Sequence, residues 1–430
     1  MLVYLSTVSR PAAVEPGPGP GPRRRRFALV SGNVVALGTV SLITDISAEM
    51  VAAVLPLYLV LGLQLSPVAF GVLDGVHTGA TALLRVVGGF AADRFRRRKL
   101  IAGIGYTLSA VAKLGLLLAG RSIPAIGAVI AVDRLGKGVR SAPRDALITL
   151  SSPPEALGRA FGVHRAMDSF GAFLGPLAAF AVLLLVGQSY DAVFVTSFCV
   201  AALAVVVLVL FVRERPAGEP TEQPSDPTVS VREVFGLLRS GPARRLVLAA
   251  AMLGLATIGD GFVYLLLQRR EDLGLRWFPL LAVGTSLAYL LLAAPLGVLA
   301  DRVGRLPVVI GGYAALGATY LLLAGPVDGW LLIALTLALY GAFYAATDGV
   351  LIALAGPVLP ARLRTTGIAL VQTGQALAYL VSSVLFGLAW QAWGPENAIR
   401  AAAVAVAGVL VGTLLLLASP SRLITRKVPR

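Results

Sequence analysis

The sequence predicts an all-α membrane protein with twelve transmembrane helices, arranged as two six-helix bundles that repeat one another. Three observations support this prediction. Hydrophobic residues make up 57% of the 430 residues and charged residues only 14%, whereas a soluble protein carries about 25% charged residues. The apolar residues fall into blocks that are long enough to cross a bilayer. Similar short motifs also occur at matching places in the two halves of the chain.

The apolar blocks set the expected spans, because a hydrocarbon core of about 30 Å needs about 20 helical residues. The first bundle, residues 33–212, is expected to have spans near residues 33–62, 69–92, 100–120, 123–143, 159–187 and 191–212. The second bundle, residues 246–418, is expected to have spans near residues 246–267, 277–300, 307–325, 329–356, 364–391 and 397–418. An even number of spans places both chain ends on the same side of the membrane.

Three polar segments flank the bundles. Residues 1–32 form a Pro- and Gly-rich tail that ends in four arginines, residues 213–245 form a Pro-rich linker, and residues 419–430 form a basic tail. This composition is typical of flexible chain without a core of its own. Of the 37 Lys and Arg residues, 28 fall on the side of the chain ends, five on the other side and four within spans. The positive-inside rule therefore predicts an inner-membrane protein with cytoplasmic termini and a cytoplasmic linker.

Composition also excludes several classes of function. The formal charge of +15 does not indicate nucleic-acid binding, because the basic residues lie in short stretches between apolar blocks and form no basic domain. Cys199 is the single cysteine, so no internal disulfide forms. No metal-ligand spacing, phosphate-binding loop or catalytic constellation is present. We therefore expect neither a cofactor nor a metal, and no enzymatic activity.

A short motif closes the second and the eighth span. Gly89-Phe-Ala-Ala-Asp93-Arg94 and Gly297-Val-Leu-Ala-Asp301-Arg302 lie at corresponding positions of the two halves. The second copy continues through Val303 to Arg305, and the whole run resembles a loop signature of the major facilitator superfamily. The resemblance implies a cytoplasmic gate formed by Gly89, Asp93, Arg94, Gly297, Asp301, Arg302 and Arg305. Anchoring of the topology alone is the alternative, and in the first copy Arg96 replaces the usual glycine.

Further motifs extend this resemblance over nearly the whole chain. Arg134-Leu-Gly-Lys137-Gly138 resembles an element of the fourth span of that superfamily. Gly171-Ala-Phe-Leu-Gly175-Pro176 resembles the antiporter signature of its drug exporters, whose closing glycines are replaced here. The alternative for this run is general packing through small residues. Residues 133–148 and 158–168 are similar to a prokaryotic permease branch, which implies the major facilitator fold but no substrate.

Two acidic residues lie deep within the first span. Asp45 and Glu49 are one helical turn apart on one face, and charges at this depth usually face a cavity or a partner. Two adjacent carboxylates resist double ionisation, so the pair is expected to exchange protons. Arg134, within the fourth span, would stabilise the ionised form or attract an anionic substrate. A permanent ion pair is the alternative for the carboxylates, and a local pair with Asp133 for Arg134.

The second half supplies a matching set of polar residues. Asp260 lies in the seventh span, the counterpart of the first, and Tyr264 follows one turn later. Tyr340, Tyr344 and Asp348 lie on the tenth span. These five residues are expected to line a central cavity and contact substrate, although ordinary packing explains the tyrosines equally well. The sequence assigns no role to His77, His164 or Lys113.

Together these features predict a secondary transporter that exports a small organic compound, a drug or a metabolite, in exchange for protons. The expected partners are this substrate, protons and the lipid bilayer, and the protein is expected to be a monomer. Import of an organic anion by proton symport is the first alternative. A membrane sensor or enzyme built on a transporter-like frame is the second.

Overall fold

The computed structural model describes residues 30–79, 97–153, 156–187, 189–214, 239, 241–348 and 364–418. These residues form helices joined by short turns, without a strand among them. Within these ranges, nine helices are long and apolar enough to cross a membrane. The prediction of a multi-pass helical membrane protein is therefore confirmed, while the number twelve stays a prediction. Both tails and linker residues 215–238 lie outside the described ranges.

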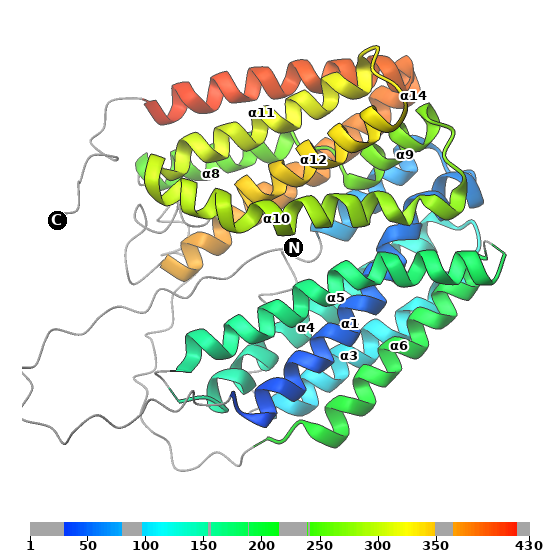
Figure 1. Cartoon of the computed structure of the whole chain (residues 1–430), viewed down its shortest axis with the longest axis vertical. Coiled ribbons are helices and arrows are strands. Elements are labelled where there is room, and N and C mark those ends of the chain that lie inside the picture. The colour runs from blue at the N-terminus through cyan, green and yellow to red at the C-terminus, as the bar shows by residue number, and fades with distance from the viewer. Residues whose placement is uncertain are drawn as a thin grey trace, which may run out of the picture.

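The N-terminal bundle comprises residues 30–214. Its helices are α1 (Gly32–Leu57), which ends in the π-helical turn η1 (Tyr58–Gly62), then α3 (Arg98–Leu118), α4 (Ile123–Leu150), α5 (Leu157–Leu185) and α6 (Tyr190–Phe211). Residues 67–79 are also helical. Helix α1 packs against α5 and α6, and α3 packs against α4 and α6 (Figure 1). Serine side chains cap the first turns of α1, α4 and α6 and satisfy amides that the helices leave free.

The C-terminal bundle comprises residues 241–418. Its elements are α8 (Gly241–Leu255), α9 (Asp260–Arg270), η3 (Leu275–Trp277), α10 (Pro279–Val303), α11 (Arg305–Ala324), α12 (Gly329–Thr347) and α14 (Arg364–Ala418). Helix α8 begins within the predicted linker. Helix α14 is kinked at Gly394, whose φ of 80° interrupts the helix just before Pro395. Its two arms correspond to the predicted spans 364–391 and 397–418.

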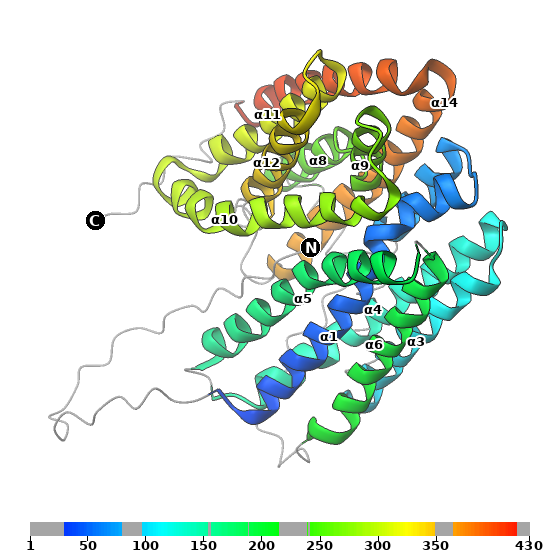
Figure 2. The ribbon, with the colours of Figure 1, turned by 45° about the vertical axis from the view of Figure 1, so that its right-hand side comes forward.

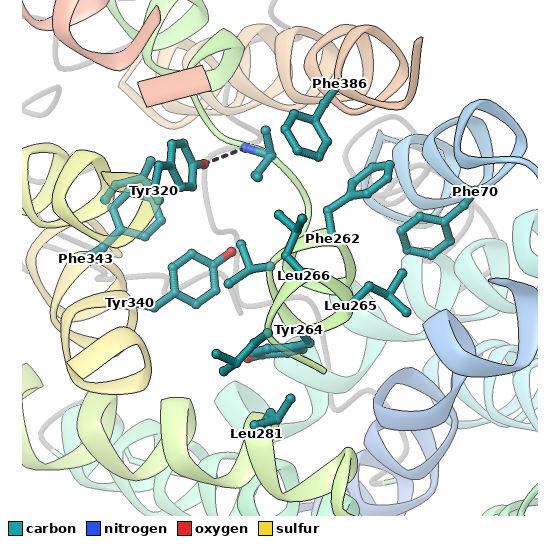
Figure 3. Packing of buried hydrophobic residues seen from close by; sticks show 14 of the residues in the cluster. Phe70, Phe262, Tyr264, Leu265, Leu266, Leu281, Tyr320, Tyr340, Phe343 and Phe386 are labelled. Carbon is teal, nitrogen blue, oxygen red and sulfur yellow. Dashed lines mark hydrogen bonds between the residues drawn. The ribbon is translucent and has the colours of Figure 1, made fainter. Parts of the chain in front are cut away.

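The predicted seventh span, residues 246–267, is not one continuous helix. It is broken between α8 and α9, where residues 256–259 are non-helical. Tyr320 of α11 supports the break, because its hydroxyl accepts a hydrogen bond from the Ile258 amide (3.0 Å) and donates one to the Ala256 carbonyl (3.4 Å) (Figure 3). Non-helical backbone at membrane depth is tolerated where protein groups satisfy it in this way. The break makes Asp260 the first residue of α9.

The two bundles meet at one end of the molecule. We call the membrane face at which α1 begins the N-terminal face, and the other the opposite face. Figures 1 and 2 both show the described helices of the bundles diverging toward the N-terminal face. Near the opposite face, Phe70 of the N-terminal bundle packs edge to face on Phe262 of α9, with ring centroids 4.7 Å apart, and Phe262 packs on Phe386 of α14 at 4.9 Å (Figure 3). This conformation is therefore held closed at the opposite face.

Candidate functional site

A cavity of about 460 Å³ lies between the two bundles. Helices α1, α4, α5 and residues 67–79 line it from the N-terminal bundle, and α9, α10, α12 and α14 from the C-terminal bundle. Among the described residues, seven acidic, basic or imidazole side chains lie on its wall, namely Glu49, Asp74, His77, Arg134, Lys137, Asp260 and Asp348. A volume of this size suits a small organic ligand. Ionisable groups at membrane depth are expensive and usually functional, so we take this cavity as the candidate site.

Asp260 lies at the N-terminus of α9, where the helix dipole favours negative charge. The Tyr340 hydroxyl donates a hydrogen bond to Asp260 Oδ1 (2.7 Å), and the Tyr344 hydroxyl donates a short one to the same oxygen. Tyr264 packs edge to face on Tyr340, with centroids 6.3 Å apart (Figure 3). Residues predicted from the sequence in two different spans thus converge on one carboxylate. Within the described part of the chain, Asp260 Oδ2 accepts no hydrogen bond.

Asp348, the fifth residue predicted to line the cavity, follows the last turn of α12 and lies on the cavity wall with Asp260, Tyr264 and Tyr344, whereas Tyr340 is fully buried and not on the wall. Its Oδ2 accepts a hydrogen bond from the Tyr289 hydroxyl of α10 at 3.1 Å. Arg165 of α5 approaches the same tyrosine from the N-terminal bundle. The sequence indicated neither Tyr289 nor Arg165, because the two residues meet only when the bundles do.

The two carboxylates of α1 have different surroundings. Glu49 lines the cavity, and its carboxylate makes no hydrogen bond or ion pair with the described residues. Asp45 is not on the cavity wall. It faces Arg140 Nη2 at 4.0 Å and the carboxyl group of Asp168 on α5. The sequence treated Asp45 and Glu49 as one pair. In the structure, only Glu49 of the two lines the cavity.

Arg134 forms the local pair that the sequence left open as an alternative. Its Nε lies 3.0 Å from Asp133 Oδ2, and its Nη2 makes a short contact with the same oxygen. Asp133 also receives a short hydrogen bond from Ser109 and lies 3.5 Å from the ammonium of Lys113. The buried Lys113, which had no assigned partner, is therefore neutralised by Asp133. Arg134 keeps its place on the cavity wall because Asp133 holds one edge of its guanidinium.

We expect Asp133→Asn to destabilise the protein by about 3–5 kcal/mol, because it leaves two buried cations without their counter-ion. Thermal or denaturant unfolding of the purified protein in detergent measures the effect. Asp191→Asn is the control, since Asp191 is exposed in the first turn of α6 and should change the stability by no more than about 0.5 kcal/mol. Equal stability of Asp133→Asn and the parent protein would show that the network contributes nothing.

Lys137 is a cavity residue that the sequence quoted in a motif but did not assign to the site. It lies one turn after Arg134 on α4 and on the same cavity wall. Its ammonium makes no hydrogen bond or ion pair with the described residues. Because Lys137 lies one turn beyond the candidate residue Arg134, helical periodicity could have placed it on the same face.

Asp74 connects the two bundles. Its Oδ2 accepts hydrogen bonds from the hydroxyls of Ser383 (2.6 Å) and Tyr379 (3.1 Å), both on α14. Asp74 also lines the cavity, as does His77, to which the sequence assigned no role. His164, the other unassigned histidine, lies 3.0 Å from the Ser41 hydroxyl within the N-terminal bundle.

The glycine motif of α5 lies against α1. A Cβ added at Gly171 would overlap the Leu42 carbonyl oxygen, and one added at Gly175 would lie 2.5 Å from the Glu49 Cβ. Pro176 lies on the cavity wall. The two glycines thus bring the backbone of α5 close to α1 beside Glu49, which is the close packing that small residues permit.

The predicted gate is described only in its second copy. Gly89, Asp93 and Arg94 lie outside the described residues. Asp301 and Arg302 are exposed in the last turn of α10, and Gly304, with φ of 99°, turns the chain into Arg305 at the start of α11. A Cβ added at Gly297 would meet no described atom within 4 Å. Gly297 therefore makes no close helix contact with the described residues.

No group of three or more His, Cys, Asp or Glu side chains that could hold a metal occurs in the described ranges. The charges on the cavity wall are instead arranged singly or in pairs with basic and phenolic groups. This arrangement is suited to reversible binding of an organic solute and of protons.

Comparisons with known proteins agree over most of the chain. The sequence model of the Major Facilitator Superfamily matches residues 37–285 and 270–430. An uncharacterized MFS-type transporter of Methanocaldococcus jannaschii is 30% identical over 370 residues, which cover 84% of this chain and 89% of that protein. An uncharacterized protein of Mycobacterium bovis is 37% identical over 158 residues, or 36% of this chain and 38% of its own length.

Solved structures share the fold at low sequence identity. The nucleoside transporter NupG has a TM-score of 0.75 and 13% identity, covering 90% of this chain and 99% of its own. A bacterial homolog of the human lysosomal transporter Spinster, in an inward-facing and unoccupied conformation, has a TM-score of 0.66 and 16% identity, covering 90% and 94%. At these identities the similarity concerns the arrangement of the helices and not the substrate.

Proposed function

Because this chain belongs to the major facilitator superfamily and is a secondary transporter, we propose that it exports a small organic compound in exchange for protons. The substrate binds in the cavity between the bundles. The bundles then rock so that the cavity opens alternately to each membrane face. The protein works as a monomer in the inner membrane, with both termini and the N-terminal face on the cytoplasmic side.

The single observation that carries proton coupling is the position of Glu49. Its carboxylate lies on the cavity wall and has neither a hydrogen bond nor an ion pair with the described residues, so a proton and a substrate can both reach it. Asp45 lies one turn behind Glu49 and provides a second protonatable group. Arg134 and Lys137 supply positive charge on the same wall of the cavity.

Gating is proposed at both faces. The Asp93 and Asp301 loops latch the cytoplasmic face when the cavity faces outward, because Asp301 and Arg302 are both exposed at the end of α10. At the opposite face, Asp74 and the aromatic cluster of Phe70, Phe262 and Phe386 hold the bundles together. Protonation weakens the ionic contacts of one state, and substrate release accompanies the other opening.

A second candidate is import of an organic anion by proton symport. The observation that favours it is the pair of cations, Arg134 and Lys137, on one wall of the cavity. An anionic group of the substrate would form an ion pair with Lys137, whose ammonium makes none with the described residues. Both candidates use the same cavity and the same carboxylates, and they differ in the direction of net flux.

Transport assays in vesicles of defined orientation distinguish the two candidates. The assays use expressing and deleted cells, and the compounds followed are those whose extracellular level depends on the protein. An exporter is expected to accumulate such a compound in everted vesicles with an acidic lumen, and to lose the accumulation when the gradient is collapsed. Accumulation in right-side-out vesicles under an inward proton gradient supports the symporter instead. Binding without flux in proteoliposomes of either orientation would reject transport altogether.

A further inference from the structure

We propose that the substrate of this cavity is a zwitterion, whose cationic nitrogen binds at Asp260 and whose anionic group binds at Lys137 and Arg134. The proposal rests on the proposed function, because it names the class of compound that the transporter carries. It is argued from the distribution of charge over the two walls of the cavity.

The wall formed by the C-terminal bundle is acidic. Asp260 and Asp348 lie on it, and among the described residues that line the cavity this bundle contributes neither a lysine nor an arginine. Asp260 is held in place by Tyr340 and Tyr344, which both bond to Oδ1 and leave Oδ2 open to a ligand. An ammonium group at Oδ2 would form a charge-assisted hydrogen bond.

The same wall also offers aromatic faces. Tyr264 and Tyr344 lie on the cavity wall with Asp260, whereas Tyr340 is fully buried, its ring 5.2 Å from that of Tyr344. The face of a tyrosine ring attracts a cation, and the effect grows where water is excluded. The site is therefore built for a nitrogen cation, including a methylated one, more than for a neutral hydroxyl group.

The wall formed by the N-terminal bundle carries the two cations of the described cavity lining, Arg134 and Lys137, together with the acidic Glu49 and Asp74. Asp133 neutralises Lys113 and holds Nε and Nη2 of Arg134, which leaves Nη1 of Arg134 without a hydrogen bond to the described residues. Lys137 likewise makes no hydrogen bond or ion pair with the described residues, although Glu49 and Asp45 are near enough to interact with its charge. Of the two acids, Asp74 accepts hydrogen bonds from Ser383 and Tyr379 of α14. Glu49 becomes neutral in the proposed cycle when it takes up a proton. The protonated state therefore presents two cations toward the cavity.

A ligand of one charge satisfies only one of these walls. An organic anion would pair with Lys137 but would lie opposite Asp260 and Asp348. An organic amine would pair with Asp260 but would lie opposite Lys137 and Arg134. Like charges facing each other in a partly desolvated site are strongly disfavoured, which gives discrimination as well as affinity. A zwitterion satisfies both walls, and because it bridges the bundles it would stabilise the approach of one to the other.

The test measures equilibrium binding and does not depend on flux. The purified protein in detergent is titrated with three sets of compounds, each set sharing one carbon skeleton (phenylpropyl, indolylethyl or linear six-carbon) as an amine, a carboxylic acid and an amino acid. The readout is the shift of the apparent melting temperature, converted to affinity by its dependence on concentration. For at least one skeleton, the amino acid is expected to bind tenfold or more tightly than the other two forms.

Variants then change the preferred charge. Asp260→Asn is expected to weaken the amino acid about tenfold or more and to make the carboxylic acid the preferred form, whereas Lys137→Gln makes the amine preferred. Asp260→Glu keeps the charge and should keep the preference. The charge-neutralising controls are Asp191→Asn and Arg121→Gln, which lie on exposed turns outside the cavity and should leave binding unchanged.

The outcomes separate this proposal from the proposed function. The zwitterion proposal is overturned if no amino acid binds, if the amine or the acid binds as well as the amino acid, or if neither cavity variant changes the preferred charge. Proton-driven flux of a compound that carries a single charge would overturn it while leaving transport intact. Charge-selective binding without flux in proteoliposomes would support the zwitterion site and reject the proposed function.

Discussion

Glu49→Gln is expected to abolish proton-driven accumulation while leaving membrane insertion and substrate binding intact. Glutamine keeps the size and polarity of the side chain but cannot take up or release a proton. A gradient of one pH unit is worth about 1.4 kcal/mol per proton, which supports roughly tenfold accumulation of an exchanged substrate. In the variant this accumulation should fall to the level of passive equilibration. Proteoliposomes with an imposed pH gradient provide the measurement.

Parallel variants assign the coupling to its residue. Asp45→Asn tests the second carboxylate, and we expect it too to lose gradient-driven flux, because Asp45 lies one turn from Glu49 and faces Arg140. Asp191→Asn, exposed at the start of α6, is the control for loss of one carboxylate. Exchange of labelled for unlabelled substrate without a gradient shows whether the cavity still binds. Full gradient-driven transport in both single variants and in the double variant would reject the assignment.

The second large effect is expected at Gly387, where the bundles meet near the opposite face. A Cβ added at Gly387 of α14 would lie 2.5 Å from the carbonyl oxygen of Pro67 and 3.0 Å from the Cα of Val68. Because both are backbone atoms, they have little freedom to move aside. Gly387→Leu therefore destabilises the conformation that is closed at the opposite face. An overpacking cost of about 1–3 kcal/mol shifts that equilibrium by roughly five- to 150-fold, and transport should fall accordingly.

Accessibility of the cavity measures this shift. Cys199 is the single cysteine, so Cys199→Ala gives a cysteine-free background in which Ala52→Cys reports from the cavity wall. An impermeant maleimide added at the opposite face should label the reporter faster in Gly387→Leu than in the parent. Gly408→Leu is the matched control on the same helix, since a side chain there would meet no described atom within 4 Å. Unchanged labelling together with unchanged transport would contradict the proposed closure.

Within the candidate site, the sequence indicated which residues are neighbours where the signal was local. Asp260 and Tyr264 are one turn apart on one helix, and Tyr340 and Tyr344 are one turn apart on another, so each pair shares a face by periodicity alone. The contact between the two pairs, in contrast, depends on residues that are far apart in the sequence. The hydrogen bonds from Tyr340 and Tyr344 to Asp260 join residues 80 and 84 positions apart, and no spacing within a single helix carries that information.

Periodicity along one helix did not show which of two neighbouring side chains faces the cavity. Residues four positions apart on a helix differ in direction by about 40°, and this rotation is enough to turn Asp45 toward Arg140 while Glu49 faces the cavity. Arg134 shows the same limit. Its sequence neighbour Asp133 and the carboxylates of the first span were both possible partners, and spacing along one helix does not distinguish them. Only the positions of the neighbouring helices decide which partner each charge finds.

By itself, the sequence determined that the chain is a multi-pass helical membrane protein, and its motifs indicated the family. Hydropathy over about 20 residues is a local property, and it favours insertion of the segment into a bilayer whatever the neighbouring helices are. The tertiary structure decided which charges reach the cavity and where α8 and α9 separate. Residues 256–259 are apolar or small and gave no signal of a break, because the hydroxyl that satisfies their backbone belongs to Tyr320, on another helix. Burial at membrane depth makes such distant partners decisive, since no water is present to replace them.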